Sequence, residues 1–226
     1  MAAGPCAAGA AGSIPQLALA VTDAARLEHA AVPTLRFALR IASDGAAVRS
    51  VLLDVQIRIA ATRRAYPHDA DDRLFELFGA RADWGTTLRS LLWTRTTLVV
   101  PPFTDATEVD LLVPCTYDLD VTAAKYLGAL RDGDVPLEFL FSGSVFYAGP
   151  GGLLQTARIP WEREAEYRLP VAVWRAAMDA HFPDSAWLRL DRESHDRLVA
   201  YKSRRALPTW AAVLDELLPR EAEGAP

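Results

Sequence analysis

The sequence predicts a mainly β fold of the α+β class, in which an antiparallel, sandwich-like sheet domain over residues 16–168 precedes a helical extension over 169–226 packed on it. Several segments before residue 160 alternate apolar and polar residues, which is the period of a strand with one face in the core. Gly, Pro and Asp separate these segments and indicate turns. After residue 170 the apolar residues recur every three to four positions, as in amphipathic helices.

The first part of the chain predicts a tail and then strands. Residues 1–15 are rich in Ala and Gly and have little to bury, so we expect a disordered tail. A first short strand is indicated from Leu17 to Val21. Segments 34–41 and 51–59 alternate strongly and are separated by the turn Ser43-Asp44-Gly45, so we predict that they form a hairpin.

The pattern changes between the predicted strands 51–59 and 91–100. Segment 71–78 begins with acidic residues and is followed by Gly79, which are the start and stop signals of a helix. We expect this short helix to lie across one end of the sheet. Segment 91–100 then predicts a strand that ends at Pro101-Pro102, and residues 105–107 predict a turn.

The longest alternating stretch runs from Val109 to Tyr147 and predicts a central hairpin with its turn at Asp132-Gly133. Pro114 has no amide hydrogen for a ladder bond, so we expect a break between two strands there. The alternation loses phase over residues 122–130, where Ala, Lys and Leu at helical spacing and Thr122 as a cap would permit a short helix. We favour a strand with a bulge over this helix.

The remaining segments predict the end of the sheet and three helices. The glycines at 149–152 indicate a turn rather than a phosphate loop, because no Gly-Lys-Ser/Thr follows. A strand over 153–159 then ends the β region at Pro160-Trp161. Pro170 fits the first position of a helix that stops at Phe182-Pro183. A second helix spans about 192–206, and Thr209 is a suitable cap for a third.

Composition limits the partners and the compartment. The 226 residues carry a formal net charge of -5, with a pI near 5.4. Such a chain has no global positive field, so a nucleic-acid partner is not expected. Two cysteines are too few for a disulfide framework or a four-ligand zinc site, which favours a cytoplasmic protein. We expect no membrane association, because the N-terminus lacks the features of a signal peptide and no run approaches about 18 apolar residues.

The candidate chemistry is sparse. Cys115 is the only candidate nucleophile inside the fold and lies on the apolar phase of a strand, where an inert core thiol is the favoured interpretation. The four histidines have no metal-ligand spacing. The acids between 105 and 120 favour solvated strand faces over a divalent-cation site. These acids are Asp105, Glu108, Asp110, Asp118 and Asp120. We therefore predict no catalytic residue, metal or cofactor, and favour a protein that is not an enzyme.

One charged segment is a candidate binding surface. Between Arg189 and Arg205 the chain carries six basic residues and three acidic ones. An ordinary solvated helix face is the favoured interpretation, but the segment could bind an acidic partner or a phosphate group. The tryptophans of this part of the chain favour core positions or an interface anchor. The candidate residues for a partner or an anion are Arg197, Lys202, Arg204, Arg205 and Trp210.

Three segments carry a family resemblance: 113–147, Ile159-Pro160-Trp161 and YKSRRALPTW at 201–210. With them the chain resembles an uncharacterised, mainly actinobacterial family that is classed as a domain of unknown function. The resemblance implies no catalytic residues. Members are sometimes encoded near nickel-iron hydrogenase genes, and the segment ending in FSGSVF resembles strands of SecB-like export chaperones. Both likenesses imply an accessory or assembly role. The likeness to SecB-like chaperones rests on similarity of fold alone.

We therefore expect a cytoplasmic, non-enzymatic protein-binding or chaperone-like accessory factor whose partner is another protein, for which hydrogenase assembly is one candidate pathway. Two alternatives stay open. One is a small-molecule enzyme of the hydrolase type that uses Cys115 or the scattered acids. The other is an anion- or phosphate-binding protein that uses the basic C-terminal helix.

Overall fold

The computed structural model describes residues 14–116, 121–160, 162–183 and 189–218. The strands are β1 (Leu17–Arg26), β2 (Thr34–Ser43), β3 (Val48–Ile59), β4 (Leu91–Val100), β5 (Ala106–Pro114), β6 (Asp134–Ala148), β7 (Leu154–Ile159) and β8 (Glu164–Pro170). The α-helices are α1 (Asp71–Phe78), α2 (Trp84–Thr87), α3 (Thr122–Ala129), α4 (Val171–Asp179), α5 (Arg192–Arg204) and α6 (Trp210–Leu217). The 3-10 turns are η1 (Ala61–Arg63), η2 (His68–Ala70), η3 (Arg81–Asp83) and η4 (Pro150–Gly152).

The chain divides into two compact units, residues 1–186 and 187–226. The first unit includes α4, which contacts β1, β2 and β8, and the predicted boundary at 168–169 stays a prediction. That the helices after residue 186 pack on the sheet domain stays a prediction. The expected disorder of residues 1–15 falls mostly outside the described residues. Among the described helices, none is long and apolar enough to cross a membrane.

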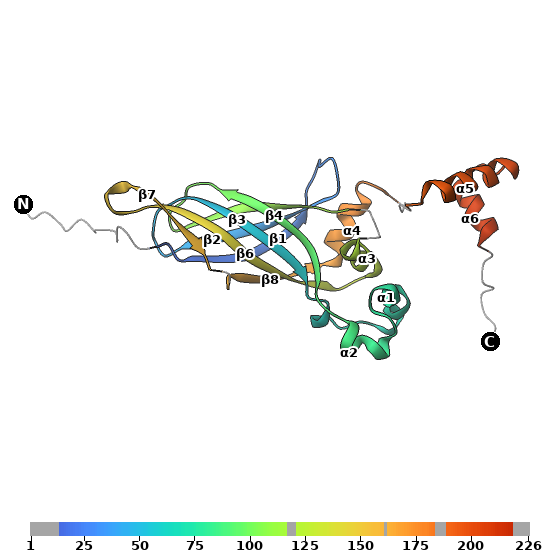
Figure 1. Cartoon of the computed structure of the whole chain (residues 1–226), viewed down its shortest axis with the longest axis horizontal. Coiled ribbons are helices and arrows are strands. Elements are labelled where there is room, and N and C mark those ends of the chain that lie inside the picture. Colours follow the sequence, from blue (N-terminus) through green and yellow to red (C-terminus); the bar gives the residue numbers. More distant parts are fainter. Residues whose placement is uncertain (1–13, 117–120, 161, 184–188, 219–226) are drawn as a thin grey trace, which may run out of the picture. The chain divides into compact units, whose positions relative to one another are not determined.

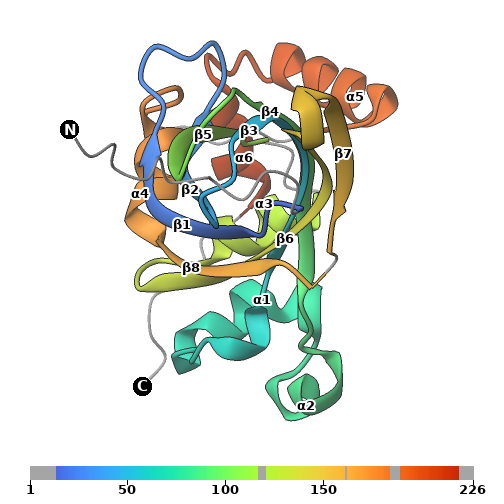
Figure 2. The same cartoon turned by 90° about the vertical axis from the view of Figure 1, so that its left-hand side faces the viewer.

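Two antiparallel sheets form the first unit, which confirms the predicted mainly β fold with C-terminal helices (Figure 1). The smaller sheet has the order β1-β2-β5 and the larger one the order β4-β3-β6-β7. The 15-residue strand β6 is central: β3 pairs with it along one side, and β8 and then β7 pair along the other. Viewed along the strands, the two sheets lie on opposite sides of a common interior (Figure 2).

β2, β3, β5 and β6 lie where strands were predicted, but the predicted hairpin pairings are wrong. β2 pairs with β1 and β5, whereas β3 pairs with β4 and β6. Similarly, β5 and β6 belong to different sheets. The turn at 43–45 and the segment after Pro114 therefore carry the chain from one sheet to the other. Each sheet buries one face, so the alternation is the same whether the chain returns within one sheet or crosses to the second.

Residues 122–129 form the helix α3, so the favoured strand with a bulge is wrong. The buried side chains of Ala123, Tyr126 and Leu127 recur at helical spacing, and the alanines have a high intrinsic preference for helix. Val121 is the N-cap and Thr122 the first helical residue, so Thr122 makes no cap. The chain breaks after Pro114 as predicted, because β5 ends there.

Arginines satisfy carbonyl groups at the end of α3, where the helix itself offers no donors. Arg73 Nε donates to the Ala129 carbonyl over 2.7 Å, and Arg175 Nη2 donates to that of Leu130 over 2.6 Å. Arg64 fastens the turn at Gly133 by donating from both terminal nitrogens, to the carbonyls of Asp132 and Asp134. These guanidinium groups position the chain where it enters β6.

The predicted end of the β region at Pro160-Trp161 is wrong, because β8 follows at 164–170. In β8, Leu169 is fully buried, while Glu164 and Glu166 are exposed. The strand is short and rich in charge, so its alternation is easily overlooked. Pro170 ends β8 and is the N-cap of α4, so the helix begins at Val171, one position later than predicted.

Phe37 lies at the centre of the core between the two sheets. Its ring contacts Phe139 of the opposite sheet at a centroid distance of 5.3 Å, and Trp93 and Tyr167 at 6.2 Å, all edge to face. Aromatic rings prefer this geometry because the edge of one ring is attracted to the face of the other. Alternating apolar residues of β2, β3 and β6 contribute much of the remaining core, as predicted.

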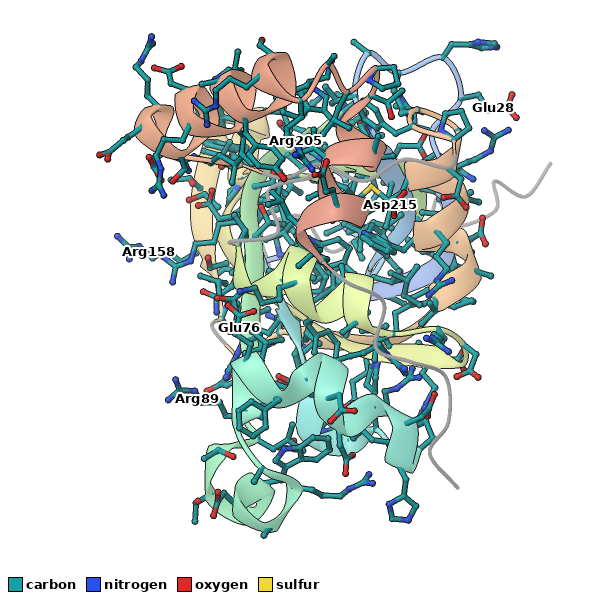
Figure 3. The ribbon with its side chains drawn as sticks, turned by 90° about the vertical axis from the view of Figure 1, so that its right-hand side faces the viewer. Glu28, Glu76, Arg89, Arg158, Arg205 and Asp215 are labelled. Carbon is teal, nitrogen blue, oxygen red and sulfur yellow. The ribbon has the colours of Figure 1, made fainter. Side chains whose placement is uncertain are left out.

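A second aromatic group holds α1 and α3 against the end of the sheets, where the predicted helix 71–78 is confirmed (Figure 1). The Tyr66 hydroxyl donates to the Ala61 carbonyl over 2.7 Å, so its single proton is committed there. The fully buried Tyr126 hydroxyl must then donate to Tyr66 across their 2.7 Å contact. Phe78 and Trp84 pack edge to face on this pair. On the surface, Lys125 of α3 forms an ion pair with Glu76 of α1 (Figure 3 labels Glu76).

Candidate functional site

Helix α5 carries most of the predicted binding residues and buries almost nothing. Its N-cap is Asp191, whose carboxylate accepts hydrogen bonds from the backbone amide of Ser194 at 2.8 Å and from the Ser194 hydroxyl at 2.7 Å. These bonds lower the pKa of Asp191. None of the helix residues is fully buried. Leu198 and Tyr201 are half-buried, whereas Val199 is exposed.

Helix α6 begins as predicted at the cap Thr209, whose hydroxyl oxygen accepts from the backbone amide of Ala212 at 3.1 Å. Val213 is its only fully buried residue. Four large apolar side chains of this short helix and its C-cap remain between 43% and 66% exposed. They are Trp210, Leu214, Leu217 and Leu218. A helical pair of this size cannot cover its own apolar surface.

Three of the five predicted binding residues join the two helices to each other. Arg205 forms an ion pair with Glu216, and its hydrogen bond lowers the pKa of that carboxyl (Figure 3 labels Arg205). Lys202 Nζ donates to the Pro208 carbonyl over 3.2 Å and lies 5.8 Å from the centre of the Trp210 ring. Arg205, Lys202 and Trp210 therefore already use part of their bonding capacity within the helical pair.

Arg197 and Arg204 are arranged differently. Both line a surface hollow of about 440 Å³ on one flank of α5, together with Ser194, Leu198, Ala200, Tyr201 and Leu217. We call it the α5 hollow. The two arginines are two helical turns, or roughly 10 Å, apart. Within the part of the chain that the structure describes, neither makes an ion pair or a hydrogen bond. That the five candidate residues bind a partner or an anion stays a prediction.

The acidic residues of α6 reduce the basic character of the pair. The six basic residues between Arg189 and Arg205 face five acids once Asp215 and Glu216 are added to the three within that segment. The pair is thus nearly neutral as a whole, and Arg197 and Arg204 keep unpaired positive charges in the α5 hollow. The long-range attraction of a polyanion is correspondingly weak.

Cys115 is a buried thiol, as predicted. Its side chain is 6% exposed, and burial raises its pKa to about 12. The protonated thiol is a poor nucleophile at neutral pH. It lies on the wall of a small cavity whose described lining contains no histidine and no charged side chain. Nothing in that lining could therefore remove its proton.

The predicted acids are consistent with solvated strand faces where they are described. Asp110 projects from the outer face of β5 and pairs with Arg36 at 3.1 Å, and Glu108 is also exposed. Asp118 and Asp120 lie outside the described residues. Over the described ranges, no group of three or more His, Cys, Asp or Glu residues could hold a metal ion. Trp174 is in the core as predicted, Trp210 is exposed, and Trp161 and Trp187 are not described.

The described chain is thus a two-sheet β protein with a separate, poorly buried helical pair. Residues 14–226 match a family described as a family of unknown function, DUF6084, and the chain belongs to this family. This agrees with the predicted membership of an uncharacterised family. No curated protein matches the chain.

The similar solved structures are distant. The CARDB domain of a Pyrococcus furiosus protein, solved in complex with di-metal ions, is 9% identical, with a TM-score of 0.28 over 69% of this chain and 92% of that one. A late embryogenesis abundant (LEA) protein is 13% identical, with a TM-score of 0.32 over 70% of this chain and 73% of its own. β-Glucosidase 3B from Thermotoga neapolitana is 13% identical, with a TM-score of 0.25 over 68% and 17%. Likenesses of this size support no inference about function.

Proposed function

We propose that the protein is a non-enzymatic, protein-binding accessory factor that contacts its partner through α5 and α6. The observation that carries this proposal is the exposed apolar surface of α6. Trp and Arg are enriched where protein interfaces gain most of their free energy, and both occur on this pair. The protonated state of Cys115 and its uncharged surroundings support a role without chemistry.

The partner and the compartment are part of the proposal. The nearly neutral helical pair favours a protein over a nucleic acid. We place the function in the cytoplasm, where the low cysteine content fits a reducing environment. The chain resembles a family whose members are sometimes encoded near nickel-iron hydrogenase genes, so a hydrogenase assembly protein is the first partner to test. A chaperone-like action on that partner belongs to the same hypothesis.

The test compares two double variants of the full chain, expressed with a tag in its own host. Leu214→Gln with Leu218→Gln removes apolar surface from the helical pair. Leu153→Gln with Leu154→Gln makes the same change at side chains that are 71% and 67% exposed near the β6–β7 turn. Quantitative mass spectrometry after crosslinking should show one stoichiometric partner that the first variant loses and the second keeps. Equal recovery with both variants, or no partner with the unmodified chain, would contradict the proposal.

A second candidate function, anion binding, is favoured by the two unpaired arginines of the α5 hollow. If they hold a phosphate group, inorganic phosphate should bind with an affinity that falls as salt is added. Replacing Arg197 and Arg204 by Gln should abolish this binding, whereas Arg192→Gln, on another face of α5, should not. Phosphate titration by calorimetry at two NaCl concentrations measures the difference. An affinity unchanged by the double replacement would exclude this site.

A further inference from the structure

A cavity of about 150 Å³ lies where the two sheets separate along one side of the first unit. β4 is the edge strand of the larger sheet and β5 the edge strand of the smaller one. The short segment 101–105 joins them at one end. At the other end, Trp93 and Thr94 of β4 line the cavity together with Pro114, the last residue of β5, and with Cys115 and Thr116 that follow it. We call this space the seam cavity.

A β-bulge in β4 gives the seam cavity two neighbouring wall residues. Ile57 of β3 is opposite Thr94 and Arg58 is opposite Leu92, so Trp93 is an extra residue without a partner. In a regular strand, Trp93 and Thr94 would project from opposite faces of the sheet. The bulge turns Trp93 so that both side chains line the cavity. Bulges of this kind often occur beside binding sites because they redirect a side chain.

The remaining walls are fixed by the core. The described lining from α3 and the residue before it is Val121, Ala123, Ala124 and Leu127. Trp174 of α4 completes it and is 7% exposed. The Trp93 ring packs edge to face on the central Phe37. Residues held in this way cannot collapse into the space without repacking the core, so the cavity is preformed.

The lining defines the chemistry of an occupant. No described lining residue is charged, so an ionic ligand would lose its hydration without a counter-charge. The Thr94 hydroxyl has no hydrogen-bond partner within the described ranges and lies on the inward-facing side of β4, opposite the buried Ile57. A volume of about 150 Å³ is the size of cavity that accepts a benzene ring. It is smaller than the site of a drug-sized ligand.

We propose that the seam cavity binds a neutral, ring-sized apolar molecule that carries one hydrogen-bonding group for Thr94. Phenol has this chemistry and serves as the probe. Two rings, those of Trp93 and Trp174, form the walls against which it would pack. The hydroxyl of Thr94 forms a hydrogen bond with the hydroxyl of phenol, whereas benzene has no group that can form one.

The experiment titrates the full chain with phenol and with benzene and follows backbone amide shifts by NMR. Phenol should cause saturable shifts at the lining residues and bind about fivefold more tightly than benzene, which is the effect of one ordinary hydrogen bond. Thr94→Val should remove the preference for phenol, and Thr94→Ser should keep it. Absence of saturable shifts at the lining residues, or a preference for phenol that survives Thr94→Val, would overturn the proposal.

Filling the seam cavity with a larger side chain provides an independent test. Ala124→Leu should abolish binding of both probes, whereas Ala129→Leu, a buried position of the same helix outside the lining, should not. Val121→Trp places bulk at a wall residue that is 40% exposed, so it should also abolish binding while the core stays folded. Thermal unfolding checks that each variant is folded. Wild-type affinity in a folded Ala124→Leu or Val121→Trp variant would place the probes elsewhere.

Discussion

At the scale of the residue, Gly143 marks the closest approach of two neighbouring strands. Its φ is +136°, in a region that residues with a side chain rarely adopt. A Cβ atom built on it would lie 2.0 Å from the Leu52 carbonyl oxygen of β3. The contact involves backbone on both sides, so no side-chain rotation can relieve it.

Gly143→Ala should therefore destabilise the protein strongly, by roughly 3 kcal/mol or more, because β6 must move away from β3. Urea unfolding followed by tryptophan fluorescence measures this change. Gly85→Ala is the matched control, since a Cβ there meets nothing within 4 Å and φ is not positive. It should leave stability unchanged or raise it slightly. Similar losses for both variants would show that the close approach at Gly143 is absent.

Cys115 should make the stability of the protein depend on alkaline pH. The thiol ionises near pH 8.5 in an unfolded chain, whereas burial holds its folded pKa at about 12. Its contribution is complete below the unfolded pKa and is lost as pH rises towards the folded one. Between these values the free energy of unfolding should fall by about 1.4 kcal/mol per pH unit from this group.

In Cys115→Ala this part of the slope should disappear, even though the variant is less stable at pH 7. Urea unfolding at a series of pH values from neutral to alkaline compares the two slopes. Parallel slopes would mean that the thiol ionises equally in both states, which would revive the interpretation of Cys115 as a nucleophile.

At the scale of the element, local pattern predicted the strands but not their partners. The alternation of 34–41 and 51–59 identified β2 and β3 correctly, yet both sheets bury a face and require the same alternation. Whether the chain returns within one sheet or crosses to the other depends on the packing of the whole sandwich. The helix α3 was recognised from the sequence only as the less favoured alternative, because the segment lies within a longer alternating stretch.

The candidate site was predictable only where one helix determines it. The basic character of α5 follows from its own sequence, and so does the cap at Thr209. The pairing of Arg205 with Glu216 and the contact of Lys202 with Trp210 depend on how α6 crosses α5. The seam cavity was missed because it combines a bulge in β4 with residues of β5, α3 and α4. A single extra residue in an alternating strand is the only signal that the sequence carries for it.

The Tyr66–Tyr126 pair offers a test of how α3 is attached to the sheets. Tyr126→Phe removes one donor but leaves Tyr66 bonded to the Ala61 carbonyl, so it should cost about 1 kcal/mol. Tyr66→Phe leaves the buried Tyr126 hydroxyl without its acceptor and should cost about 2 to 3 kcal/mol. Chemical denaturation of both variants shows which substitution lowers the free energy of unfolding more. A larger loss for Tyr126→Phe would reverse the assigned direction of the hydrogen bond.

At the scale of the whole molecule, burial is divided very unevenly between the two units. Almost the entire core belongs to residues before 186, whereas Val213 is the one fully buried side chain among the described residues after it. Helices with so little burial open easily, since most helical stability in proteins comes from packing. The helical pair is thus the part that a partner could order on binding.

Limited trypsin digestion of the full chain should accordingly cut first between Arg192 and Arg205 and leave the sheet unit intact. Mass spectrometry of the early fragments identifies the sites. The basic residues of β2, β3 and β4 serve as internal controls, because they lie in paired strands. Early cleavage within those strands would contradict the division of stability. Protection of α5 by a captured partner would support the proposed binding surface.

The position of β6 also determines when this protein can fold during its synthesis. β6 pairs with β3 across roughly 80 to 100 residues of chain, and with β7 and β8 that follow it. At a translation rate of about 5 to 20 residues per second, β3 waits several seconds for its partner. During that interval the edge of β3 that pairs with β6 has no partner for its backbone hydrogen bonds. A nascent chain stalled before residue 134 should therefore display β3 as a recognition segment for ribosome-associated chaperones.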